Sequence, residues 1–353
     1  MNFALQPAQA HRRARSDAGI SAGAGAVRPG PAGLCEPSAH LAGRNSLRTK
    51  FNGTHGHSAR PVWKPYGLTT SWWLKHADTK ATPMWQVLRP GQGCRYIIEG
   101  RYKPHAEPAG IIRISRNQRY LGGGGEFDIT ALRPGTTTVH AVDRTGTCFG
   151  ELQISVVETF RRTLRFCYLA NEDGDGVLTS RSSRSGAALA AVLREANGIL
   201  SGWTGLEFVW SNNHSVPKLR IGDSLARGYD TQRHRALVMA DARVANPVAA
   251  HVYLVDRFTN PNMLGFAHIS DTPRTRGAII LSDRPKHPGT VLAHELVHLL
   301  ISSPADRAAA GMDAEGHSAS TDDLMYHGVE FDSGAVTGTR IPRQQATFIN
   351  PSL

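Results

Sequence analysis

Two histidines and a glutamate interrupt an otherwise apolar stretch, "AHELVHLL", at residues 293–300. A carboxylate buried among apolar side chains is costly unless a partner offsets the loss of hydration. On a helix, His294 and His298 are four residues apart, so both imidazoles project from one face and can hold one ion. Glu295 can then lie beside a water on that ion and take its proton. The spacing predicts a metal site with a glutamate base; an ordinary helical turn with two incidental histidines is the alternative.

A third protein ligand is expected downstream, in the stretch "GHSASTDDLMYHG" and the residues just before it. His317 is the predicted ligand, and Asp313 and Glu315 are the alternatives. Zinc is the expected metal, because it takes imidazole ligands in open tetrahedral sites and lowers the pKa of a bound water to about 7. The sequence therefore predicts one catalytic Zn2+.

These motifs resemble the metzincin zinc peptidases, and within them the matrixins, in which the third zinc histidine is followed by serine and then by an "LMY" turn. The matching residues here are His317, Ser318 and Leu324-Met325-Tyr326. The resemblance implies hydrolysis of peptide bonds, a hydrophobic floor formed by Met325 beneath the metal, and a terminal helix at "IPRQQATFIN". Tyr326 either stabilises the oxyanion of the tetrahedral intermediate or packs, and its place directly after Met325 favours packing.

The spacing of the third histidine departs from the family's HExxHxxGxxH pattern. Ile301 stands at the glycine position, and His317 follows His298 by nineteen positions instead of six, an excess of thirteen. Closing a longer loop costs little, because the entropy penalty grows only logarithmically with length. We therefore predict that residues 301–316 fold as a short helix and loop outside the active site, with Gly311 or Gly316 supplying the turn.

The elements around the motif predict an α/β layer architecture for residues 158–353. An amphipathic helix is expected where apolar residues recur at helical spacing from Leu189 to Leu200, with Ser185 near its N-cap. The motif helix is expected to follow "KHPGT", with Thr290 as its cap. Strands are predicted at "TLRFCYLA", "LEFVWS", "KLRIGD", "HVYLVD" and "GAIILSD".

Residues 62–157 have the sequence pattern of an antiparallel β-sandwich, with short strand-like stretches separated by turn residues. These stretches are "RYIIEG", "GIIRIS", "EFDITAL", "TTTVHAVD" and "ELQISVV". The segment resembles bacterial Ig-like domains, which implies an accessory module for adhesion, spacing or substrate binding. Cys94 and Cys148 fall within it and either pair in an oxidising compartment or remain two separate buried thiols.

Residues 1–61 are predicted to be a disordered basic leader, because they lack any hydrophobic period. Residues 1–60 carry eight Lys and Arg against two Asp and Glu, so +6 of the net charge of +11 lies there. No recognisable binding module accompanies this charge, and nucleic acid is not an expected partner. No window reaches the run of about 18 apolar residues that a membrane span needs. An extracellular or cell-surface location is expected, although the leader shows no signal peptide; Cys35 is a candidate cap for the zinc.

A calcium loop is the other metal site considered, at "NEDGDG". Asn171, Asp173 and Asp175 stand at alternate positions, and Gly176 follows at the turn, but the twelfth position is Ser182, where an EF-hand needs glutamate. A plain polar turn is the favoured interpretation, with Ca2+ as the alternative. The remaining histidines of this region are expected to be surface or hydrogen-bonding groups; they are His268, His287 and His327.

The sequence thus predicts a multidomain protein in which an Ig-like β-sandwich is followed by an α/β metzincin-like catalytic domain. The predicted activity is that of a zinc metalloendopeptidase acting on protein or peptide substrates. The alternative is a surface binding or adhesion protein with an inactive peptidase-like domain. Neither the cleavage specificity nor the oligomeric state has a signature in the sequence.

Overall fold

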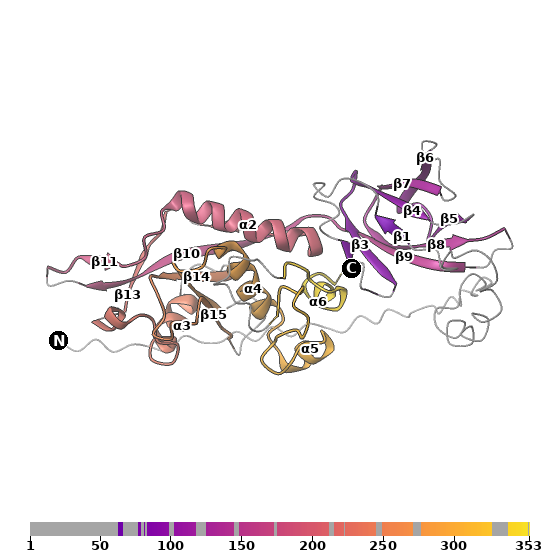
Figure 1. Ribbon diagram of the computed structural model, residues 1–353. Helices are drawn as coiled ribbons and strands as arrows, with labels where there is room; N and C mark the ends of the chain where they lie inside the picture. Colours follow the sequence, from indigo (N-terminus) through magenta and orange to yellow (C-terminus); the bar gives the residue numbers. More distant parts are fainter. Residues whose placement is uncertain are drawn as a thin grey trace, which may run out of the picture. The chain divides into compact units, whose positions relative to one another are not determined.

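The computed structural model describes most of the chain after residue 62 (Figure 1), and these residues belong to one compact unit, residues 52–353. The described residues are 63–65, 77–78, 81, 83–98, 102–117, 125–144, 148–172, 175–211, 215–221, 223–244, 249–270, 277–326, 338–351 and 353. The predicted leader, with Cys35, lies outside them, as do Asp173 and His327. The described part is rich in β-structure and contains three sheets.

Residues 63–156 form two sheets that contribute side chains to one hydrophobic core. The strand orders are β1-β4-β7-β6 and β2-β3-β9-β8-β5. Along β4, Cys94, Tyr96 and Ile98 are buried while the residues between them are more exposed, as expected of strands with one face in a core. The bounds are β1 Trp63–Pro65, β2 Ala77–Asp78, β3 Met84–Leu88, β4 Gly93–Ile98, β5 Lys103–Glu107, β6 Ile112–Asn117, β7 Gly125–Ala131, β8 Gly135–Val142 and β9 Cys148–Val156.

The two cysteines of this region do not form a disulfide with each other in the structure. Cys94 is buried in the shared core, whereas Cys148 is half-buried and lies next to His140. The two thiols therefore have different surroundings, which agrees with the alternative of separate thiols, although Cys148 is not fully buried.

The third sheet is built around the long strand β10, Phe160–Glu172, and has the order β11-β10-β14-β16-β15, with β12 and β13 also pairing with β10. The pairs of β10 with β12, β13 and β14, and of β14 with β16, are parallel, whereas β11 and β15 are antiparallel to their neighbours. The bounds are β11 Leu178–Ser180, β12 Leu206–Trp210, β13 Lys218–Arg220, β14 Ala250–Val255, β15 Gly265–His268 and β16 Ala278–Ser282.

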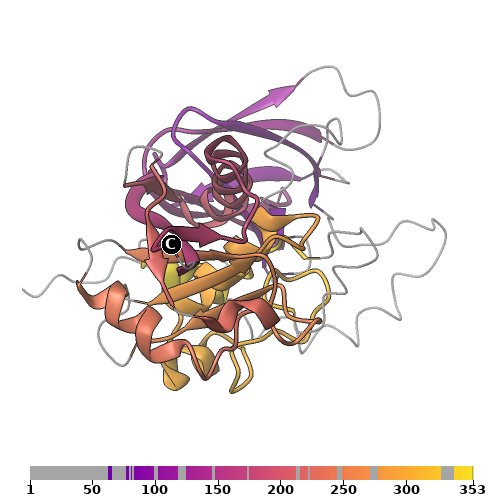
Figure 2. The ribbon, with the colours of Figure 1, turned by 90° about the vertical axis from the view of Figure 1, so that its left-hand side faces the viewer.

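Helices cover both faces of this third sheet. The helices α2, Gly186–Thr204, and α4, Pro288–Leu300, share one core with Val252 and Leu254 of β14. Helix α3, Arg235–Val244, packs in a second core with Tyr253 and Val255, which point to the opposite face. Figure 2 shows α2 and α3 on opposite sides of the sheet. Burial on both faces explains why every residue of β14 and β16 is buried and why both strands are mostly apolar instead of alternating.

The strands predicted from the sequence are present, and Ser185 caps α2 by accepting a hydrogen bond from the Ala188 N–H. The prediction that Thr290 caps the motif helix was wrong, because α4 begins at Pro288 and has His287 at its N-cap. Glu195 of α2 takes over this role: its carboxylate accepts from the Gly289 N–H and from the Thr290 hydroxyl. The remaining helices are η3 Asp223–Arg227, α5 Pro304–Ala309 and α6 Arg343–Ile349. No helix in the described part is long and apolar enough to cross a membrane.

Candidate metal centre

Helix α4 brings His294 and His298 together on one face. Their Nε2 atoms are 3.1 Å apart and their ring centroids 4.8 Å apart. Two imidazole nitrogens bound to one tetrahedral zinc at about 2.05 Å are separated by about 3.3 Å. Burial, followed by the neighbouring charges of His294 and His317, lowers the pKa of His298 well below its usual range, which favours the neutral form that a metal requires.

His317 reaches the same place from the loop after α5. Its ring centroid lies 5.6 Å from that of His294 and 4.9 Å from that of His298. One ligand atom from each of the three histidines lies within 4.8 Å of the other two. The structure therefore brings together the three predicted zinc ligands, and we call them the three-histidine group.

The two alternative third ligands lie beside this group and are not part of it. The carboxylates of Asp313 and Glu315 are each 3.9 Å from Nδ1 of His317, and their side chains are 56% and 75% exposed. Asp313 accepts hydrogen bonds from the backbone N–H groups of Glu315 and His317. The bond from His317 is the main cause of a lowered Asp313 pKa. Asp313 therefore fixes the loop that carries His317.

The inserted stretch is folded as predicted, with the short helix α5 followed by a loop. Gly311 and Gly316 both have positive φ, of 71° and 90°. Only Gly316 contacts the three-histidine group: a Cβ atom added there would lie 3.0 Å from Nδ1 of His298. A glycine is needed at this turn because of both the backbone conformation and the close approach of the imidazole.

A backbone carbonyl orients His294. Nδ1 of His294 lies 2.7 Å from the carbonyl oxygen of Leu324. Because a carbonyl can only accept, Nδ1 must carry the proton, and Nε2 is left with the lone pair that a metal needs. This interaction has no signature in the sequence, because its acceptor is a backbone atom.

Leu324 belongs to the turn predicted to contain the methionine. Met325 is fully buried in the same core as α4. The Ser318 N–H donates to the Met325 carbonyl at 2.7 Å, and the Ser318 hydroxyl donates to the buried carboxylate of Asp323. Tyr326 is half-buried and pairs with Ser318 in a β-bridge. These contacts fix the backbone of the turn, and the two roles considered for the Tyr326 side chain both remain predictions.

Arg340 holds this turn from the C-terminal segment. Its Nε donates to Asp323 at 2.7 Å, and its Nη1 donates to Asp78 at 2.8 Å. Both carboxylates are buried. The Leu324 N–H also donates to the Arg340 carbonyl at 2.7 Å. Arg340 therefore pairs with both buried carboxylates, and this long-range contact has no signature in the sequence.

Glu295 lies against the edge strand β15. Its side chain is almost fully buried, and burial raises its pKa to about 8, opposed by a hydrogen bond from the backbone of Ala267. A Cβ atom at Gly265 would lie 2.8 Å from its Oε1. A nearby cation would lower this pKa and favour the carboxylate. Glu295 is thus held between the histidine-bearing helix and β15.

The other predicted residues lie elsewhere. His268 is buried and bonded to the Tyr229 hydroxyl at 2.8 Å, and His287 is at the start of α4 near Glu195. Asn171 is in β10, and Asp175 is in the turn that joins β10 to β11, with Gly176 at positive φ. This hairpin differs from a helix–loop–helix calcium site. Neither metal-binding group found among the described residues contains Asp175.

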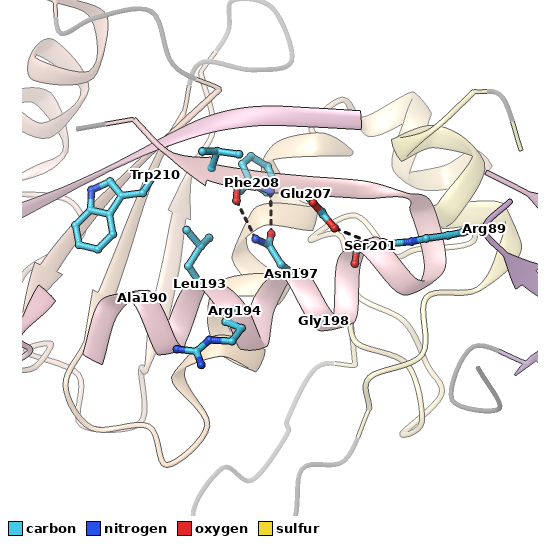
Figure 3. A pocket seen from close by; sticks show the side chains of 11 residues that line it. Arg89, Ala190, Leu193, Arg194, Asn197, Gly198, Ser201, Glu207, Phe208 and Trp210 are labelled. Carbon is cyan, nitrogen blue, oxygen red and sulfur yellow. Dashed lines mark hydrogen bonds and ion pairs between the residues drawn. The ribbon is translucent and has the colours of Figure 1, made fainter. Parts of the chain in front are cut away.

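One cavity in the described part of the chain lies away from this centre. It has a volume of about 550 Å³ and lies between α2 and β12, where Asn197 bonds the backbone of Phe208 (Figure 3). None of its lining residues belongs to the three-histidine group. The cavity therefore does not identify the substrate of the candidate centre.

Comparison with protein-family models gave no match, and comparison with curated proteins gave none. Among solved structures, the S-layer protein rSbsC(31-844) has 13% identity and a TM-score of 0.18, covering 28% of this chain and 16% of that chain. A structure of domains 4 and 5 of the S-layer protein SbsC has 14% identity and a TM-score of 0.18, covering 28% of this chain and 55% of that chain. A chaperone-substrate complex has 12% identity and a TM-score of 0.28, covering 78% and 44%. These scores are too low to show a shared fold.

Proposed function

We infer that the protein is a zinc metalloendopeptidase. The observation that carries this inference is the convergence of His294, His298 and His317. Glu295 follows His294 directly on α4, and its side chain is buried. Three imidazoles with an open fourth position are the donor set of catalytic zinc, and structural zinc sites are closed by four protein ligands. In the HExxH arrangement, the glutamate that follows the first histidine ligand acts as the general base.

The three histidines would hold zinc, which supplies a Lewis acid that acidifies water and polarises a carbonyl group. Glu295 takes the proton from the attacking water and delivers it to the leaving amine. Leu324 keeps the His294 imidazole in the tautomer that has its lone pair on Nε2. In its apolar surroundings, the Glu295 carboxylate would interact strongly with a metal cation held by the three histidines.

The proposed substrate is an extended peptide. The strand β15 is the end strand of the described sheet and lies directly against Glu295 through the backbone of Ala267. An edge strand can bind an extended peptide through backbone hydrogen bonds, independently of its side chains. A peptide bound along β15 would pass the carboxyl group of Glu295, which is the geometry that an endopeptidase requires.

The resemblance to metzincins gains support from three features. The turn that contains Met325 is buried and contacts His294 through Leu324, and a terminal helix, α6, follows it. The thirteen-residue excess is accommodated by α5 and its loop. The alternative of an inactive binding protein assumed that this excess displaces the third ligand, and the position of His317 argues against that assumption. The two-sheet region at 63–156 remains a proposed Ig-like accessory module.

The test is zinc content measured together with hydrolysis of an unfolded protein substrate. The purified full chain should contain zinc in the three-histidine group, lose activity when a chelator removes it, and regain activity when zinc is added back. A chain that binds no zinc at this group, or one that binds zinc there without cleaving any unfolded substrate, would contradict the proposal. The second outcome would favour the binding protein.

A further inference from the structure

A second group of metal-ligating side chains lies on the sandwich, on the face of β8 and β9 that points away from the core. It consists of His140 on β8 and of Cys148 and Glu151 on β9. Nδ1 of His140 lies 3.7 Å from Sγ of Cys148 and 3.4 Å from Oε1 of Glu151. The three ligand atoms lie within 4.8 Å of one another.

A β-bulge creates this arrangement. Residues 148 and 151 are three apart, so in a regular strand their side chains would point to opposite faces. In β9, Glu151 pairs with His140 and Cys148 pairs with Val142, because the register shifts between Ala141 and Val142. The extra residue in β9 reverses the alternation of side chains and places Cys148 and Glu151 on the same face as His140. Bulges commonly redirect a side chain in this way.

We propose that His140, Cys148 and Glu151 bind a divalent metal of the zinc class, at a site separate from the three-histidine group. A tetrahedral zinc separates sulfur from nitrogen by about 3.6 Å and nitrogen from oxygen by about 3.4 Å. The two distances in the structure, 3.7 and 3.4 Å, agree with these values. A thiolate and a carboxylate also balance the two positive charges of the ion.

The step that loads the site is a proton exchange. In the metal-free chain the Cys148 thiol lies 3.7 Å from the Gly150 carbonyl, to which it donates. On binding, the thiol releases this proton to solvent and the sulfur bonds the metal. The Glu151 side chain is 25% exposed, so solvent reaches the site and can occupy the fourth position. The metal would tie β8 to the bulged end of β9.

Cobalt(II) titration of the metal-free full chain tests the proposal, with a phosphine reductant present. A thiolate bound to cobalt gives a near-ultraviolet charge-transfer band, and a site made only of histidines gives none. We expect this band in the wild type and two cobalt ions per chain. Cys148→Ser should lose the band and one ion. The double variant His294→Ala, His298→Ala should keep the band and lose the other ion.

Matched controls are available in the same chain. Cys35→Ser and Glu107→Gln remove another thiol and another carboxylate, and both should keep the band. Glu151→Gln should weaken cobalt binding at this site at least about tenfold. This variant tests the proposal even if Cys148→Ser fails to fold. A wild type without the band, a band that survives in Cys148→Ser, or unchanged affinity in Glu151→Gln would overturn the proposal. If the wild type binds one cobalt ion and shows no band, the proposal for this second site fails and the peptidase proposal stands. If the wild type binds one ion and shows the band, this site is supported and the peptidase proposal is contradicted.

Discussion

Nδ1 of His294 donates a hydrogen bond to the carbonyl oxygen of Leu324 at 2.7 Å, although the two residues are thirty positions apart. This bond joins the histidine-bearing helix α4 to the turn that contains Met325. It fixes the orientation of the imidazole and leaves Nε2 free of the proton. The turn therefore has a chemical role at the candidate centre in addition to its packing role.

Removal of Arg340 should weaken zinc binding from a distance. Arg340→Met leaves the buried carboxylate of Asp323 without its cation, which loosens the turn that holds Leu324. We expect zinc affinity to fall about 10- to 100-fold, as for other partners of metal ligands. Arg257→Met, which removes an arginine bonded to the Ala226 carbonyl, is the control and should bind zinc normally. Equal affinities in the two folded variants would show that the turn does not orient His294.

Gly316→Ala should reduce zinc affinity, because its Cβ would press on the imidazole of His298. Gly311→Ala is the matched control: it places the same side chain at positive φ, and its Cβ would meet the flexible end of Gln344 instead. Both substitutions should lower the free energy of unfolding by about 1 kcal/mol or more. Only Gly316→Ala should change the zinc dissociation constant, measured by competition with a chelator. The same change in both variants would indicate a general effect of loop strain.

The third ligand can be identified by comparing His317→Ala with Glu315→Gln. Loss of the imidazole should lower the zinc content of the dialysed protein and its affinity for the metal, because only two histidine ligands remain. Glu315→Gln should keep both, since that side chain is largely exposed beside the group. The opposite result would make Glu315 the ligand and His317 a neighbour.

Stability should depend on pH through His251, which is buried on β14 away from the metal centre. Burial, followed by the charge of Arg165, lowers its pKa from 6.5 to about 4, whereas the charge of Asp241 opposes this shift. Because the unfolded chain binds this proton more tightly, the stabilisation is complete above pH 6.5 and is lost as the pH falls towards 4. The loss is at most about 3 kcal/mol, at about 1.4 kcal/mol per pKa unit.

His251→Gln removes this titrating group and should flatten the dependence. The free energy of unfolding by urea, measured from pH 7 to pH 4, should fall less in the variant than in the wild type. Parallel curves for the two proteins would mean that His251 does not contribute. His268, whose burial also lowers its pKa to about 4, should leave a residual slope in the variant.

The local patterns in the sequence predicted much of the fold. Strand β14 is a short, mostly apolar run, and helix α2 has apolar residues at helical spacing. Both patterns can be read without tertiary information. The short strand β15 was missed, because its four residues, Gly265–His268, show no alternation of buried and exposed positions. Helix α3 was also missed, since only three of its residues are buried.

The parts of the candidate site that depend on local residue spacing could be predicted from the sequence. The parts that depend on tertiary contacts could not. His294, Glu295 and His298 follow from helical spacing alone. The acceptor at Leu324 is a backbone atom, and Arg340 approaches Asp323 only because the chain folds back. The group at Cys148 depends on a bulge that reverses side-chain alternation, so a regular strand pattern would place its members on different faces.

The most direct test of the central claim is the rate of peptide hydrolysis by Glu295→Gln at a zinc content equal to that of the wild type. Glutamine keeps the shape of the side chain but cannot accept the proton of the attacking water. The account predicts that zinc stays bound and that kcat/KM for an unfolded protein substrate falls by about 100-fold or more. Wild-type activity in the zinc-loaded variant would contradict the account, because peptide bonds would then be cleaved without the proposed base.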